Sequence, residues 1–237
     1  MKIRRHILAF LFLCLATVGS FGQDYQYGRE ISWGITKATN SGLIGGVIGK
    51  YSIQKNDYVY HFFGFEIVNI KHPKEERYYS YTGNTYIYGK ANYLYSFRTQ
   101  YGRELSIFKK APQQGVQIHG ILAGGPSFGV IAPYYIEYYL NEQVIRVQYD
   151  PDIHDDQNSI LGTGNLLQGV GESELTIGLN VKSSLTFEFG SIKSSVVGIE
   201  TGLMFEVFTK EVPIIPTAET SSYFPSAFIS LYYGTRR

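Results

Sequence analysis

Residues 174–189 read ELTIGLNVKSSLTFEF. Glu174 and every second residue after it, up to Glu188, are polar or glycine, whereas the positions between them are apolar except for Ser183. Because side chains alternate between the two faces of a strand, this period of two predicts a β-strand with one wet and one apolar face. Strands of soluble sheets usually have about five or six residues, whereas a tilted membrane-spanning strand needs about 9 to 11 within the hydrocarbon alone. The length of this stretch therefore favours a membrane barrel.

Seven further stretches have strand patterns, and two of them, 92–105 and 196–208, alternate almost as regularly. The other five are weaker and cover residues 29–38, 42–54, 58–70, 115–131 and 224–234. Beyond the N-terminal segment, no run of 18 residues is apolar, so the sequence predicts no membrane-spanning helix. The high content of glycine and aromatic residues suits barrel strands with aromatic girdles. We expect an all-β fold, a single antiparallel transmembrane β-barrel of about eight strands.

The N-terminus has the three parts of a secretory signal peptide. Residues 1–5 are basic, 7–18 are almost wholly apolar, and small residues follow up to Gly22. We expect cleavage after about Gly22, which makes 1–22 the signal and 23–237 the barrel domain. The only cysteine, Cys14, leaves with the signal, so disulfides, thiol catalysis and zinc–thiolate sites are excluded. The mature net charge, near −2, argues against binding to nucleic acid.

The predicted strands are joined by connections of unequal length. If the N-terminus lies in the periplasm, the long connections 71–91, 132–173 and 209–223 all fall on the outer side and most short turns on the periplasmic side, as in outer-membrane barrels. Both termini are then periplasmic. Within the longest connection, 134–140 continues the strand pattern, and we expect a short helix within 160–169.

Four stretches of this chain resemble sequences from a largely uncharacterised group of Bacteroidota outer-membrane barrels. They are 70–75 (IKHPKE), 88–92 (YGKAN), 124–129 (GGPSFG) and 205–208 (FEVF). In outline the chain is similar to small eight-stranded barrels of the PorT-like type. The resemblance implies the outer membrane and the same fold, and it carries no catalytic motif.

Charged residues on the predicted strands are expected to face the lumen. A charge facing lipid near the bilayer midplane costs roughly 2–4 kcal/mol, so these residues need partners inside the barrel. Since an eight-stranded barrel is about wide enough for side chains alone, we expect a filled interior. The predicted polar network consists of Arg98, Glu104, Lys182, Glu188, Glu200 and Glu206, with Glu66 a further candidate.

One segment of the longest connection has residues that could bind a metal ion. Asp150, Asp152, His154 and Asp156 gather carboxylates and an imidazole within seven residues, and oxygen ligands of this type suit Ca²⁺ or ions that bridge to lipopolysaccharide phosphates. The EF-hand glycine and distal glutamate are missing, so a solvated acidic loop remains the alternative. No cofactor is expected.

Catalysis would need a nucleophile, a base and an orienting carboxylate at one level of the barrel. His61, His119 and His154 are the candidate bases, but the sequence has no nucleophile-elbow or HExxH motif. Residues 45–50 resemble a phosphate-binding loop only faintly and are interpreted as strand glycines. The tyrosine-rich segments 78–81 and 134–139 are candidates for binding glycans or partner proteins, or for extending strands above the membrane.

The prediction from sequence is an outer-membrane barrel with a structural, assembly or surface-interaction role and no enzymatic activity. Three alternatives stay open: a lipid-modifying or hydrolytic barrel enzyme, a small channel or transporter, and a soluble secreted β-sandwich. The expected partners are outer-membrane lipid and lipopolysaccharide, the assembly machinery during insertion, and an envelope protein complex.

Overall fold

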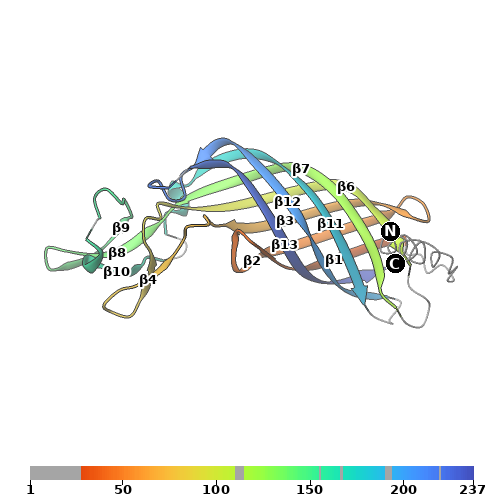
Figure 1. Ribbon diagram of the computed structural model, residues 1–237, viewed down its shortest axis with the longest axis horizontal. Coiled ribbons are helices and arrows are strands. Elements are labelled where there is room, and N and C mark those ends of the chain that lie inside the picture. The colour runs from red at the N-terminus through yellow and green to blue at the C-terminus, as the bar shows by residue number, and fades with distance from the viewer. Residues whose placement is uncertain (1–27, 110–114, 155, 166–167, 190–193, 219) are drawn as a thin grey trace, which may run out of the picture.

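The computed structural model describes residues 28–109, 115–154, 156–165, 168–189, 194–218 and 220–237. Eight strands form a closed barrel in the order β1-β13-β12-β11-β7-β6-β3-β2, and every neighbouring pair is antiparallel (Figure 1). The barrel strands are β1 (Arg29–Ala38), β2 (Ser41–Gln54), β3 (Val59–Ile70), β6 (Asn92–Phe108), β7 (Gln117–Pro133), β11 (Glu174–Phe189), β12 (Ser195–Val212) and β13 (Ser221–Arg236). The predicted signal peptide lies outside the described residues.

The closed barrel confirms the predicted fold class, and the β-sandwich alternative is wrong. Closure is made by β1, which pairs with β2 on one side and with β13 on the other. The third long connection is shorter than predicted, 213–220 instead of 209–223, because β12 continues to Val212 and β13 begins at Ser221. Among the described residues, no helix is long and apolar enough to cross a membrane.

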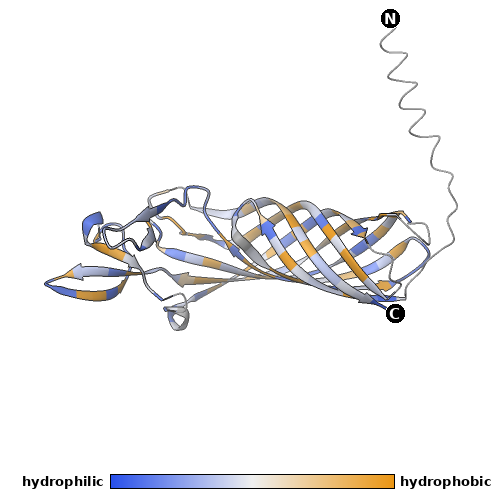
Figure 2. Ribbon diagram, turned by 90° about the horizontal axis from the view of Figure 1, so that it is seen from below, coloured by the Kyte–Doolittle hydropathy of each residue, from blue (hydrophilic) through white to orange (hydrophobic). Residues whose placement is uncertain are grey.

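The barrel is apolar outside and polar inside. Along β13 every second residue from Tyr223 to Tyr233, including Ile229 and Leu231, is exposed on the outer surface, whereas the alternate residues point inward. Figure 2 shows the same alternation of hydrophobic and hydrophilic residues around the barrel wall. Tyr223 and Tyr233 are ten positions apart; at about 3.3 Å per residue and a strand tilt near 40°, they stand roughly 25 Å apart along the barrel axis. This is about the height of the apolar band of an outer-membrane barrel.

Two of the long connections fold into a small β-structured region, here called the head (residues 71–91 and 134–173). It lies beyond the end of the barrel that is opposite to the start of β1 and the end of β13 (Figure 1). One sheet is β4 (Arg77–Tyr79) with β5 (Thr85–Ile87), and the other has the order β10-β8-β9. These strands are β8 (Tyr135–Leu140), β9 (Gln143–Gln148) and β10 (Ile160–Thr163), with short 3-10 turns at Gln157–Ser159 and Val170–Glu172.

The structure corrects the helix expected within residues 160–169. Ile160–Thr163 is a strand that pairs with β8, and Ile160 and Leu161 are buried. Pairing with β8 gives hydrogen-bond partners to the backbone N–H and C=O groups of this apolar segment. A short isolated helix would leave such groups without partners at both of its ends.

Candidate functional site

Six charged side chains fill the middle of the barrel and form what we call the central cluster. Lys50 Nζ lies 3.0 Å from Glu200, and Lys182 Nζ lies 2.8 Å from both Glu200 and Glu66. Arg98 extends this series of ion pairs, because its guanidinium group lies 3.3 Å from the Glu66 carboxylate and 2.7 Å from the Glu206 carboxylate. All six side chains are buried, and three cations meet three carboxylates. The central cluster is therefore balanced in charge.

Several ion pairs of the central cluster cross the bore instead of joining adjacent strands. Lys50 on β2 pairs with Glu200 on β12, which lies three positions away in the barrel order. Glu66–Lys182 and Arg98–Glu206 span the same interval. Hydroxyl groups of Ser184 and Ser96 donate further hydrogen bonds to the buried carboxylates. The bore is therefore filled by connected side chains.

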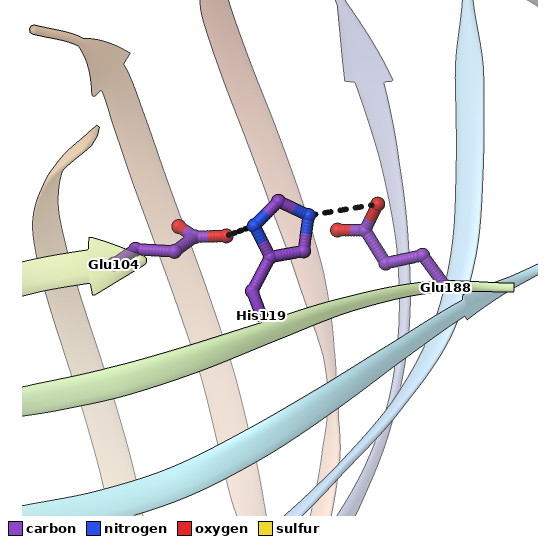
Figure 3. Close-up of side chains that lie close together, drawn as sticks. All are labelled: Glu104, His119 and Glu188. Carbon is purple, nitrogen blue, oxygen red and sulfur yellow. Dashed lines mark ion pairs between the residues drawn. The ribbon is translucent and has the colours of Figure 1, made fainter. Parts of the chain in front are cut away.

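A second group, the terminal cluster, lies at the end of the barrel where β1 begins and β13 ends. It consists of Glu30, Glu104, His119, Glu188 and Arg236, all buried. The His119 ring stands between two carboxylates, with Nδ1 3.3 Å from Glu104 and Nε2 3.7 Å from Glu188 (Figure 3). Arg236 pairs with Glu188 and, at 2.7 Å, with Glu30.

The terminal cluster has the residue types of a hydrolase but not the arrangement. The Ser52 hydroxyl donates a hydrogen bond of 2.6 Å to Glu104, so its partner is the carboxylate and not the His119 base. Ser52 is 4% exposed and His119 is fully buried, which leaves no path for a substrate. His61 lies on the outer surface beside Tyr101, and His154 lies in the head. The three candidate histidines therefore occupy separate places.

The bore is closed toward the head by an apolar plug. Inward-facing residues near the strand ends and the 213–220 connection pack together here: Val68, Ile70, Leu94, Ile131, Phe208, Val212, Ile214, Ile215 and Phe224. Gly129 makes room for this packing, because a Cβ there would lie 2.8 Å from the Phe208 ring. Just inside the plug, a cavity of about 10 Å³ borders Glu66 and Arg98, room for about one water molecule.

The head has its own core, centred on tyrosines. Tyr86, Tyr134, Ile136, Tyr149 and Ile160 are buried together. The Tyr134 hydroxyl accepts a hydrogen bond from the Ile87 amide and lies 2.8 Å from the Thr163 hydroxyl, and the Tyr149 hydroxyl accepts from Gly89. These contacts tie residues 71–91 to residues 134–173.

The head also encloses an ion pair. Lys90 is fully buried and lies 2.7 Å from Glu75. Burial lowers the pKa of Lys90, and the Glu75 carboxylate opposes that effect. A paired charge of this kind fixes the start of β6 against the first part of the head.

The predicted metal-binding residues of the 150–156 segment are not brought together. Asp150 accepts a hydrogen bond from the Asp152 amide, and the Asp150 amide donates to the His154 ring. Asp156 caps the turn at Gln157–Ser159, and the Ser159 hydroxyl and Asn158 amide lower its pKa. Within the described residues, the group of three potential ligands that does converge is Glu104, His119 and Glu188. The acidic segment therefore makes local turns.

The structure places all six residues of the predicted polar network, from Arg98 to Glu206, inside the barrel. Sequence reasoning did not assign Glu30, Lys50, Arg236 or the candidate base His119 to the interior network. Strand parity was the available signal, since Lys50 lies on the same face of the strand as Ile48 and Ser52, which are also buried. Residues 45–50 form part of β2, in keeping with their interpretation as a strand.

Comparisons with known proteins found likeness in structure only. No protein-family model matches the sequence, and no curated protein matches it. Ail, the attachment invasion locus protein of Yersinia pestis, matches at 11% identity over 90% of this chain and 100% of its own, with a TM-score of 0.40.

A second Ail structure, in complex with the heparin analogue sucrose octasulfate, gives 12% identity, the same coverage and a TM-score of 0.41. Neisserial surface protein A gives 11% identity over 88% of this chain and 96% of its own, with a TM-score of 0.39. Likenesses at this level do not bear on function, and membership of the Bacteroidota group stays a prediction.

Proposed function

We propose that this chain is an outer-membrane β-barrel that anchors a folded head at the cell surface, with a structural or surface-interaction role and no catalysis. The observation that carries the proposal is the asymmetry of the molecule. In the part of the chain that the structure describes, an apolar-sided barrel with a filled bore ends on one side in a structured head and on the other in the tight β2–β3 turn. A barrel whose lumen is plugged serves best as a membrane anchor.

The orientation follows from the two ends of the barrel. The end where β1 begins and β13 ends has a tight connection between β2 and β3, residues 55–58, whereas the other end holds the head. Outer-membrane barrels keep short turns in the periplasm and long loops outside. We therefore place the termini in the periplasm and the head in the extracellular space.

A surface-interaction role is supported by the aromatic and apolar side chains that the head leaves in solvent. Tyr79 is 79% exposed and Tyr81 is 74% exposed. Tyr139, Val144 and Ile153 are also exposed, on other parts of the head. Tyrosine combines an apolar ring with a polar hydroxyl, which suits contact with glycans such as lipopolysaccharide sugars or with an envelope protein.

The apolar plug and the central cluster argue against the channel alternative. An ion would have to displace packed apolar side chains and then break buried ion pairs. The hydrolase alternative lacks an accessible serine–histidine pair in the terminal cluster. No observation on the described residues favours either alternative over an anchor.

The proposal is tested by localisation and by labelling from outside. The expressed protein should enrich in the outer membrane and migrate differently with and without boiling. For orientation, Ile153→Cys in the head is compared with Asp57→Cys in the β2–β3 turn, both exposed positions in a chain whose only cysteine is Cys14. A membrane-impermeant maleimide should label the head variant on intact cells and the turn variant only after lysis. The reverse pattern would overturn the orientation, and recovery as a soluble protein without a heat shift would overturn the proposal.

A further inference from the structure

The terminal cluster is unbalanced in charge, unlike the central cluster. Three buried carboxylates, Glu30, Glu104 and Glu188, meet one permanent cation, Arg236. With a neutral imidazole at His119, the cluster carries two excess negative charges. Buried charges that lack compensation are strongly unfavourable in a low-dielectric interior. A divalent cation would cancel this excess.

Unsatisfied polar atoms surround the same place. His119 faces Ser106 on β6 and Thr186 on β11, directly across from it in the barrel register. The Ser106 Oγ and the Thr186 Oγ1 are buried without a hydrogen-bond partner, and the two ring nitrogens of His119 make no hydrogen bond beyond their ion-pair contacts of 3.3 and 3.7 Å with Glu104 and Glu188. His119 is fully buried and Thr186 is 1% exposed. Native proteins rarely leave such atoms without hydrogen bonds, so four on three adjacent strands indicate a bound species.

We propose that Glu104, His119 and Glu188 bind a divalent transition-metal ion of the zinc class inside the barrel. Their potential ligand atoms all lie within 4.8 Å of one another, and Glu104 already lies 3.3 Å from the His119 ring. Zinc takes imidazole nitrogen at about 2.0–2.1 Å and carboxylate oxygen at about 2.0–2.2 Å, which puts neighbouring ligand atoms roughly 3.4 Å apart. Glu104 and Glu188 approach different ring nitrogens (Figure 3), so one of the two carboxylates has to turn toward the nitrogen that binds the ion.

The surroundings supply the second layer that a metal site needs. The ring nitrogen of His119 that does not bind the ion needs a second partner, and Ser106 and Thr186, the cross-strand neighbours of His119 in the register, supply hydroxyl groups for it. Ser52 already donates to Glu104 and Tyr232 to Glu188, which orients both carboxylates. Because the site is fully buried, the ion is loaded as the barrel folds, and it stabilises the closed state.

The test measures retained metal after refolding. The full mature chain is refolded from urea into detergent micelles with Zn²⁺, desalted, and analysed for zinc by mass spectrometry and for folding by its heat shift. Wild type should retain about one zinc per chain. His119→Gln should retain at least tenfold less zinc. Glu104→Gln should lose zinc as well, and it replaces His119→Gln as the test if that variant fails to fold. Replacing Zn²⁺ by Co²⁺ should give visible ligand-field absorption in wild type only.

Matched controls separate this site from other histidines. His154→Gln alters the head and His61→Gln the outer surface, and both should retain zinc like wild type. A folded wild type that retains no zinc would overturn the inference and leave a protonated His119 between the two carboxylates. Zinc lost from the His154 variant but kept by the His119 variant would overturn it as well. These outcomes do not depend on the cellular location, which the fractionation experiment tests separately.

Discussion

The ammonium group of Lys182 lies 2.8 Å from the carboxylate of Glu200, and neither residue is more than 1% exposed. Lys182 also pairs with Glu66, so one cation serves two carboxylates from different strands. Such a side chain acts as a junction of the interior, because its removal leaves both carboxylates short of a partner.

Lys182→Met is expected to destabilise the barrel by about 3–5 kcal/mol, the usual cost of removing one partner from a buried ion pair. Urea unfolding in micelles, followed by the heat-shifted band, measures the change. The control is Ser183→Ala, the next residue along β11, which is exposed on the outer face and should be neutral. Equal urea midpoints for the two variants would mean that the central cluster contributes little.

Val181→Arg tests whether the outer face contacts lipid. Val181 is 52% exposed near the middle of β11, and an arginine at the bilayer midplane costs roughly 2–4 kcal/mol. We expect less folded protein in lipid vesicles and a lower urea midpoint. Val144→Arg in the head, where the valine is 57% exposed, should leave both unchanged. If the two variants behave alike, the barrel wall does not face lipid.

Tyr134→Phe should loosen the head without opening the barrel. The change removes the hydroxyl that the Ile87 amide bonds, and an unsatisfied buried amide costs about 1–3 kcal/mol. Limited proteolysis should cut the head faster while the heat shift of the barrel persists. Tyr139→Phe, at a position that is 44% exposed, is the control and should be cut at the wild-type rate. Unchanged cleavage of the Tyr134 variant would show that the hydroxyl does not hold the two parts together.

High pH should open the head before the barrel. Burial raises the pKa of Tyr149 from the ordinary 10 to about 12. A group whose pKa is raised on folding stabilises the folded state fully below pH 10 and loses that contribution as pH rises from 10 to 12. Protease sensitivity of the head, measured across this range, should increase. In Tyr149→Phe the protease sensitivity of the head should rise less between pH 10 and 12. If the variant and wild type gave identical profiles, the rise would be due to the ionisation of other groups.

The strands could be predicted closely because the barrel wall has one polar and one apolar face, so polar and apolar residues alternate along the sequence of each strand. For Arg29–Ala38 and Glu174–Phe189, the predicted and observed bounds coincide. The head could not be predicted in the same way, since its short strands bury residues by packing on one another. Tyr134 and Tyr149 are core residues only because 71–91 and 134–173 meet in space.

The interior was predictable at positions within long regular strands and not at strand ends. Glu30 and Arg236 lie near the ends of β1 and β13, where few alternating neighbours reveal the parity. His119 was considered only as a possible base, because nothing in the sequence brings it between Glu104 and Glu188. That placement depends on the pairing of β7 with β6 and β11.

The ion pairs that cross the bore have a kinetic consequence. Lys50–Glu200, Glu66–Lys182 and Arg98–Glu206 each join strands three positions apart, so they cannot form in an open, partly zipped sheet. An assembly transition state in which β1 has not yet met β13 lacks them. Interactions absent from the transition state slow unfolding and leave the folding rate nearly unchanged. The central cluster should therefore slow the unfolding of the inserted barrel and extend its lifetime, while the rate of insertion stays nearly the same.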